Sequence, residues 1–153
     1  MTSLSNENQN YRQLIVNHYS NPVSRGLLKT KASFVFHHDR NSCVDDFYLE
    51  LTFKQNTIIN ARFAGIGCAI STAAIDIFNT LMINQTITEV KIINNNYQAM
   101  LQGKNYHEKL LQELVAFKNV LKQPNRIKCA LIISEAIEEI FLMKHEKQGQ
   151  NDE

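Results

Sequence analysis

The sequence is poor in cysteine and has no excess charge of either sign. Its 153 residues include three cysteines, 16 basic and 15 acidic residues, for a formal net charge of +1. Three thiols cannot all pair within one chain, so no complete disulfide framework holds this fold together. A nearly balanced charge creates no field that would attract nucleic acid or an anionic membrane. We therefore expect neither as a partner.

The chain also lacks a long hydrophobic run. No apolar stretch approaches the roughly 20 residues that cross a bilayer. The polar start MTSLSNENQN does not have the basic and then apolar layout of a signal peptide. We therefore expect a cytoplasmic protein. In a reducing compartment its thiols are expected to be metal ligands, nucleophiles or buried core residues rather than disulfides.

The chain does have enough apolar residues for one domain. Hydrophobic residues make up 44% of the sequence, and a domain of this size buries roughly 70% of the surface of its unfolded chain. A core can therefore form without disulfides. We expect a flexible tail over residues 1–10, a single domain over residues 11–144 and a polar C-terminal tail over residues 145–153.

Hydrophobic periodicity first predicts a helix and then strands. Apolar and aromatic residues recur at helical spacing from Tyr11 to Tyr19, and the helix should end before Pro22, because the residue before a proline disfavours the α region. Three segments then alternate like strands, with a tight turn at Gln55 and Asn56 between the last two, where Asn56 tolerates a positive φ. These segments read SFVFHH, DDFYLELTFK and TIINARFAG.

Helical periodicity resumes at Cys68 and dominates the rest of the chain. The closing helix is expected from about Arg126 to Lys144, with Asn125 as its N-cap. The order of elements predicts an α+β fold, in which helices cover one face of a small antiparallel sheet of about three strands.

The three cysteines all fall at the ends of expected elements. Cys43 precedes the second strand, Cys68 starts a helix after Gly-Ile-Gly, and Cys129 lies in about the first turn of the closing helix. Near a helix N-terminus, backbone N–H groups and the macrodipole favour a thiolate and lower the thiol pKa below about 8.5. Alternatively, each cysteine is a small buried hydrophobic residue. Cys43 fits that alternative badly, because the polar residues of NSCVDD could not be buried without partners.

Four blocks resemble the iron–sulfur cluster assembly family that comprises IscU, SufU and the NifU N-terminal domain. In chain order they are YRQLIVNHYSNPVSRGLL, CVD, FAGIGCAIS and NRIKCALIISEAIEEI, and the resemblance covers residues 11–142. It implies a SufE/NifU-like fold and a metal site formed by Cys43, Asp45, Cys68 and Cys129. Val44 departs from the family pattern, because glycine is usual there and valine does not readily adopt a positive φ.

Two features resemble the SufU branch of this family. Lys128 stands before the third cysteine, where IscU-type members have histidine, and the segment between the second and third cysteines is expanded over about residues 98–123. This resemblance implies a zinc-dependent sulfur acceptor that works with a SufS-like cysteine desulfurase and the iron–sulfur assembly machinery. It implies a sulfurtransferase-like acceptor or a scaffold rather than a stand-alone enzyme. Cys43 is the expected acceptor, because a loop before a strand opens more easily than a helix start.

The ligand types leave alternatives open. Three thiolates and a carboxylate suit tetrahedral zinc, but sulfur ligands suit iron or a [2Fe-2S] cluster as well. One alternative is therefore a scaffold on which a [2Fe-2S] cluster is assembled and passed on. Another is a non-catalytic interaction module stabilised by zinc.

Other polar residues have weaker predicted roles. Arg126 and Lys128 are candidates to offset the negative charge of the metal site or to dock the partner, although a solvated first helical turn explains them equally. His18 is expected to hold the first helix by packing. Because successive strand residues face opposite sides, only one ring of His37 and His38 can face a given site, and we expect a surface pair at the strand end.

Overall fold

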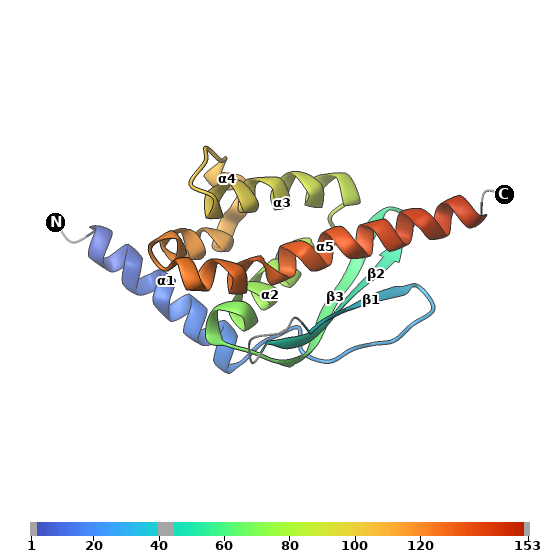
Figure 1. The fold of residues 1–153 in the computed structure, drawn as a ribbon, viewed down its shortest axis with the longest axis horizontal. Helices are drawn as coiled ribbons and strands as arrows, with labels where there is room; N and C mark the ends of the chain where they lie inside the picture. Colours follow the sequence, from blue (N-terminus) through green and yellow to red (C-terminus); the bar gives the residue numbers. More distant parts are fainter. Residues whose placement is uncertain (1–2, 40–44, 152–153) are drawn as a thin grey trace.

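The computed structural model describes residues 3–39 and 45–151, and side-chain burial for residues 7–39 and 45–149. Its sheet is antiparallel with the order β1-β2-β3, and the strands span Ser33–His38, Asp46–Lys54 and Thr57–Ile66. The helices are α1 (Ser3–Ser20), α2 (Ala69–Met82), α3 (Ile87–Leu101), α4 (Glu108–Leu111), the 3-10 helix η1 (Gln112–Lys122) and α5 (Pro124–Asn151). The predicted α+β class and three-stranded sheet are confirmed (Figure 1).

Helices cover one face of the sheet, as the alternation in β2 predicts. Phe47, Leu49 and Leu51 are at most 2% exposed and point to the same side, because strand residues two apart share a face. On this side α2 packs along β3, and α5 packs along β1 and against α2. Burying a side chain of this size contributes about 1.5–3 kcal/mol. The covered face of β2 is therefore the main anchor between sheet and helices.

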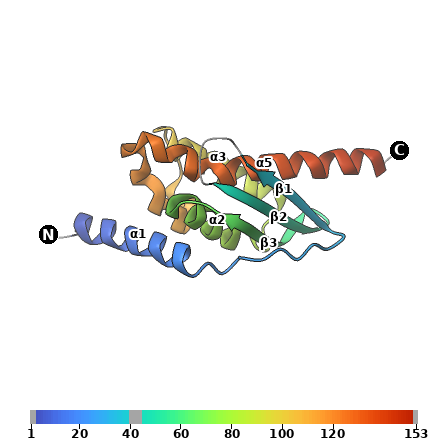
Figure 2. The same cartoon turned by 60° about the horizontal axis from the view of Figure 1, so that its bottom comes forward.

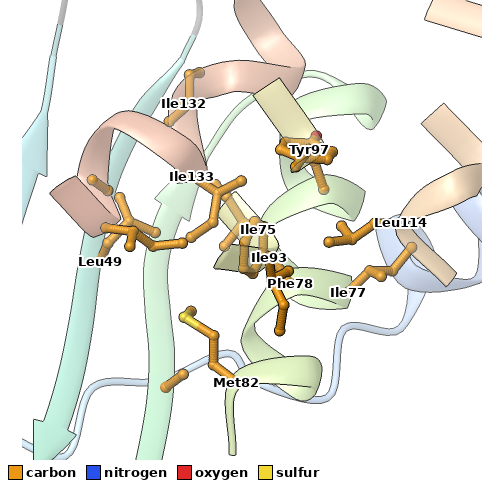
Figure 3. Packing of buried hydrophobic residues seen from close by; sticks show 14 of the residues in the cluster. Leu49, Ile75, Ile77, Phe78, Met82, Ile93, Tyr97, Leu114, Ile132 and Ile133 are labelled. Carbon is orange, nitrogen blue, oxygen red and sulfur yellow. The ribbon is translucent and has the colours of Figure 1, made fainter. Parts of the chain in front are cut away.

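The central core lies where the helices meet above β2 (Figure 3). Phe78 of α2 contacts Tyr97 of α3 edge to face, with ring centroids 5.5 Å apart. The Tyr97 hydroxyl donates a 2.7 Å hydrogen bond to the Ala130 carbonyl of α5, so the one polar atom of this ring is satisfied. Burial raises the pKa of Tyr97, and its hydroxyl stays protonated. The remaining labelled residues are Leu49, Ile75, Ile77, Met82, Ile93, Leu114, Ile132 and Ile133.

The opposite face of the sheet carries no helix within the described residues and is partly open to solvent, since Val35 and Tyr48 are 37% and 41% exposed. The segment between α1 and β1 first pairs with the edge strand β3, through Arg25 and Phe63, and then continues to β1 (Figure 2). Glu50 of β2 is 1% exposed, and its carboxylate accepts hydrogen bonds from the backbone N–H groups of Leu28 and Lys29, at 2.8 and 2.7 Å. The buried charge of Glu50 is thus satisfied by the segment that covers it.

Several element boundaries differ from the predictions. The closing helix begins at Pro124, so Asn125 lies inside its first turn and is not its N-cap. Proline is favoured at the first helical position, because its fixed φ suits a helix and its missing N–H would have no partner there. At the hairpin turn the positive φ, 57°, falls on Gln55 rather than on Asn56. Helical structure also extends into both expected tails, since α1 begins at Ser3 and α5 continues to Asn151. None of the helices within the described residues is long and apolar enough to cross a membrane.

A buried carboxylate joins α1 to α2. Asp76 of α2 is fully buried, and its Oδ2 atom lies 2.7 Å from His18 Nδ1 at the end of α1. The same carboxylate accepts hydrogen bonds from the N–H groups of Val23 and Ser24, at 3.0 and 2.8 Å, and from the Ser24 hydroxyl. His18 therefore holds the first helix as predicted, through a polar contact rather than apolar packing.

Replacement of Asp76 tests this junction. Asp76→Ala leaves several buried donors without an acceptor, and we expect the free energy of unfolding to fall by about 3 kcal/mol. Urea denaturation measures the loss. The matched control is Glu139→Ala, which removes an exposed carboxylate and should change stability by less than about 0.5 kcal/mol. Equal losses in the two variants would contradict a structural role for Asp76.

Candidate metal centre

Two glycines shape the chain between β3 and α2. Gly65 has a φ of 110°, and a Cβ atom there would come closer than 3.0 Å to the Asp46 carbonyl oxygen. A Cβ atom on Gly67 would approach Asp45 Oδ1 and the Phe47 ring equally closely. Gly65 is required because its φ is positive, a conformation that other residues rarely adopt. Gly67 is required because a side chain there would overlap its neighbours. The GIG motif therefore brings the start of α2 against the start of β2.

The Asp45 carboxylate occupies the space left by Gly67. Its Oδ1 atom accepts hydrogen bonds from the Cys68 backbone N–H at 3.0 Å and from the Ser71 hydroxyl at 2.9 Å. Asp45 is 7% exposed and Ser71 is fully buried. Two donors from the first turn of α2 thus fix the carboxylate at a helix N-terminus, where a negative charge is stabilised. Both use one oxygen, and the other stays available as a metal ligand.

Cys68 is the N-cap of α2. Its Sγ atom accepts a hydrogen bond from the Ser71 N–H at 3.4 Å and lies 3.3 Å from the Ser71 hydroxyl. The thiol is half-buried. Cys68 thus caps α2, and its predicted placement at a helix start is confirmed.

Cys129 reaches the same point from α5. The ligand atoms of Asp45, Cys68 and Cys129 all lie within 4.8 Å of one another. Three segments far apart in the sequence therefore converge as the sequence resemblance implies. Cys43 and Val44 lie outside the described residues, and their predicted roles stay predictions.

The Cys129 thiol does not have the low pKa expected from a helix start. Burial first of all, together with the neighbouring Cys68 and Asp45, raises its pKa to about 12 against the opposing effect of Arg126. Cys129 is 7% exposed and is the sixth residue of α5. The stabilising effect of a helix N-terminus fades beyond the first turn. Loss of hydration and nearby negative groups therefore outweigh the helix, and the prediction for Cys129 is wrong.

The other polar candidates lie around this cluster. Arg126 and Lys128 are both exposed on the first turns of α5. Arg126 acts to lower the pKa of Cys129. The charge-balancing or partner-docking roles of Arg126 and Lys128 stay predictions. His37 lies on the surface, 2.6 Å from Asp46 Oδ1. His38 is 7% exposed, so the expected surface pair is wrong for this second ring.

The donor set fits a zinc ion. Zinc binds thiolates at about 2.3 Å and carboxylate oxygens at about 2.0–2.2 Å, which places tetrahedral ligands about 3.5–3.8 Å apart. Three donors within 4.8 Å reach that spacing by small side-chain movements. One further ligand would close a four-coordinate shell, and the same donors would suit iron.

Ser71 is a functional candidate that the sequence analysis missed. Its hydroxyl contacts both the carboxylate and a thiol of the cluster, and residues that orient metal ligands in this way tune metal affinity. Its position in the sequence could have identified it. Ser71 lies three positions after Cys68, and a residue at that distance from an N-cap commonly forms a hydrogen bond with it.

The sequence matches a known family over most of its length. Residues 10–130 match the NifU-like N-terminal domain. The chain belongs to this family. The predicted resemblance to the IscU, SufU and NifU group is thereby confirmed, and with it membership of a family of iron–sulfur cluster assembly proteins.

Two relatives illustrate the range within the family. The chain is 32% identical over 129 residues to the zinc-dependent sulfurtransferase SufU of Bacillus subtilis, covering 84% of this chain and 86% of the relative. It is 28% identical over 152 residues to the iron–sulfur cluster assembly scaffold protein IscU of Streptococcus pyogenes, covering 99% and 94%.

Solved structures share the fold. A proposed scaffold protein for the SUF system from Fervidobacterium islandicum AW-1 has a TM-score of 0.78 and 26% identity, covering 84% of this chain and 93% of that one. A NifU-like N-terminal protein from Brucella abortus has a TM-score of 0.80 at 17% identity, covering 90% and 95%. The second likeness supports the fold alone.

Replacement of Ser71 tests its role as a positioning residue. Ser71→Ala removes a donor to Asp45 Oδ1, and we expect zinc affinity to fall about 10-fold in a chelator competition. The matched control is Ser134→Ala, because Ser134 is also fully buried on a helix and donates to Asn94. The control should lose stability but keep its zinc affinity. Equal affinities in both variants would show that the Ser71 hydroxyl does not position the ligands.

Proposed function

We propose that this protein accepts sulfur from a cysteine desulfurase during iron–sulfur cluster assembly in the cytoplasm. The observation that supports the proposal best is the convergence of Asp45, Cys68 and Cys129 on one point. Cys43, which precedes Asp45 by two residues, is the proposed fourth ligand. Bound zinc would keep the thiols deprotonated and mask their nucleophilicity until the partner docks.

Cys43 is the proposed acceptor. Its thiolate attacks the outer sulfur of a persulfide on the desulfurase, so that a new S–S bond forms on Cys43. The S–S bond on the desulfurase breaks at the same time, and its cysteine leaves as a thiolate. The transfer needs no external oxidant or reductant, because one persulfide replaces another.

The surroundings of the other ligands favour Cys43 for this step. Asp45 is fixed by two hydrogen bonds, Cys68 caps α2, and Cys129 is buried on α5. Each of these residues is tied to a packed helix, so moving one would disturb the fold. Arg126 and Lys128 are exposed beside Cys129 and are the proposed contacts for the partner. A SufS-like desulfurase is the proposed partner.

The scaffold and interaction-module alternatives differ from this proposal in measurable ways. A relative described as an IscU scaffold, at 28% identity over 152 residues, favours assembly of a [2Fe-2S] cluster on the same cysteines as the second candidate. A scaffold would carry iron and sulfide during turnover. A non-catalytic module would bind zinc but accept no sulfur from a desulfurase.

Metal analysis is the first test. We expect one zinc ion per purified chain, and we expect its removal to lower the melting temperature, because structural zinc can contribute as much as about 10–16 kcal/mol to folding. Elemental analysis and calorimetry measure both. If the metal-free protein melts at the same temperature as the zinc-bound protein or higher, zinc does not stabilise the fold. Iron with sulfide in place of zinc would favour the scaffold.

Sulfur mapping is the second test. After incubation with a SufS-like desulfurase and cysteine, mass spectrometry should locate an added sulfur of about 32 Da on Cys43. Cys43→Ser should fold but no longer stimulate desulfurase turnover. Sulfur found mainly on Cys68 or Cys129 would overturn the assignment of the acceptor. No added sulfur on any cysteine would favour the interaction module.

A further inference from the structure

The buried face of α5 ends in a lysine. Ile137, Ile140 and Phe141 are at most 8% exposed, and the next residue of this face is Lys144, which is 9% exposed. Its apolar stem is buried beside these residues, while its charged head reaches the surface, as is common for lysine. Within residues 7–39 and 45–149, no carboxylate forms an ion pair with Lys144 and no acceptor forms a hydrogen bond with it.

Aromatic rings lie close to the ammonium groups of Lys144 and Lys147. The Lys144 Nζ atom lies 5.0 Å from the centre of the Phe53 ring, and the Lys147 Nζ atom lies 5.5 Å from that of Phe34. The two rings contact each other edge to face, with centroids 5.8 Å apart. A cation–π contact of this kind contributes about 0.5–2 kcal/mol. The Lys144 ammonium is not among the buried side-chain atoms that lack a hydrogen-bond partner in the described residues, so its charge is open to solvent and to an anion.

Two cavities of about 200 Å³ each flank Lys144. The first lies toward the sheet and includes Lys147, and the second lies toward α3 and includes Lys91 and His145. No carboxylate lines either cavity among the described residues. Figure 1 shows the C-terminal part of α5 passing the β2–β3 hairpin, with the start of α3 close by. Four basic residues thus gather at one place in a chain whose charges otherwise nearly balance.

We propose that Lys144 and Lys147 bind a phosphate group in the cavity that they share. Lysine binds phosphate as a point charge. Two ammonium groups match the double negative charge of a phosphate dianion better than they match the single charge of a carboxylate ligand. Gln55 and Gln148 also line this cavity and supply amide donors. The cavity, at about 200 Å³, is smaller than the roughly 300–1,000 Å³ of sites for drug-sized ligands, and a single oxyanion group fits it.

This site is separate from the metal centre. Phe53 is at the hairpin end of β2, whereas Asp45 precedes the opposite end of the strand. The lining residues of the cavity include none of the three converging ligands. Phosphate binding is therefore independent of the proposed sulfur transfer.

Melting curves of the full chain with inorganic phosphate test the proposal. Relative to chloride at equal ionic strength, saturating phosphate should raise the melting temperature by about 3 °C or more. Lys144→Met keeps the apolar stem without the charge, and this variant should fold but lose the rise. The matched control Lys109→Met removes an exposed lysine of α4. Its melting temperature should still rise in phosphate.

The comparison of these curves can also overturn the proposal. The proposal is overturned if phosphate leaves the melting temperature of the natural chain unchanged. It is also overturned if phosphate raises the melting temperature of Lys144→Met by the same amount, which would indicate a general salt effect. Acetate in a parallel series should give a much smaller rise. An equal effect of acetate would show that the site does not select a dianion.

Discussion

The contact between the Asp45 carboxylate and the first turn of α2 holds the rest of the centre in place. Through it, the start of β2 is joined to the N-terminus of the helix that carries Cys68. The same helix packs against α5, which brings Cys129 to the cluster. Two hydrogen bonds to one oxygen therefore link the sheet, the helix layer and the proposed ligands. If the carboxylate moved away, its two donors would lose a charged acceptor in a buried place.

The surroundings of Cys129 give the metal-free and metal-bound forms different electrostatics. Without a metal, a buried thiol beside Asp45 and Cys68 stays protonated. A metal ion reverses this preference, because a coordinating thiol is deprotonated outright. Uptake of the proposed metal ion would therefore release protons and become more favourable as the pH rises. The high pKa of Cys129 limits the negative charge that the fold buries in the absence of a metal ion.

Local patterns predicted the elements well, and tertiary contacts explain the misses. The alternation of Phe47, Leu49 and Leu51 predicted β2 and its buried face, because a period of two reports directly which side is covered. The burial of His38, by contrast, depends on the position of α5, which local sequence does not specify. The high pKa of Cys129 was missed because it depends mainly on burial and then on the nearby Cys68 and Asp45, which local sequence does not specify. A helix start two residues earlier than predicted also places Cys129 beyond the first turn. The convergence of the ligands could be expected only from the family resemblance, because the cysteines are far apart in the sequence and form no closely spaced metal-binding motif.

The close contact of Asp45 and Phe47 with the Gly67 backbone has a consequence for inheritance. Every single-nucleotide missense change in a glycine codon introduces a residue with a Cβ atom, and that atom would collide with the Asp45 carboxylate and the Phe47 ring. Such a change leaves all the candidate ligands in the sequence, so a survey of ligand residues alone would judge the gene intact. Selection on this gene should therefore purge variants at a position that contributes no chemical group at all.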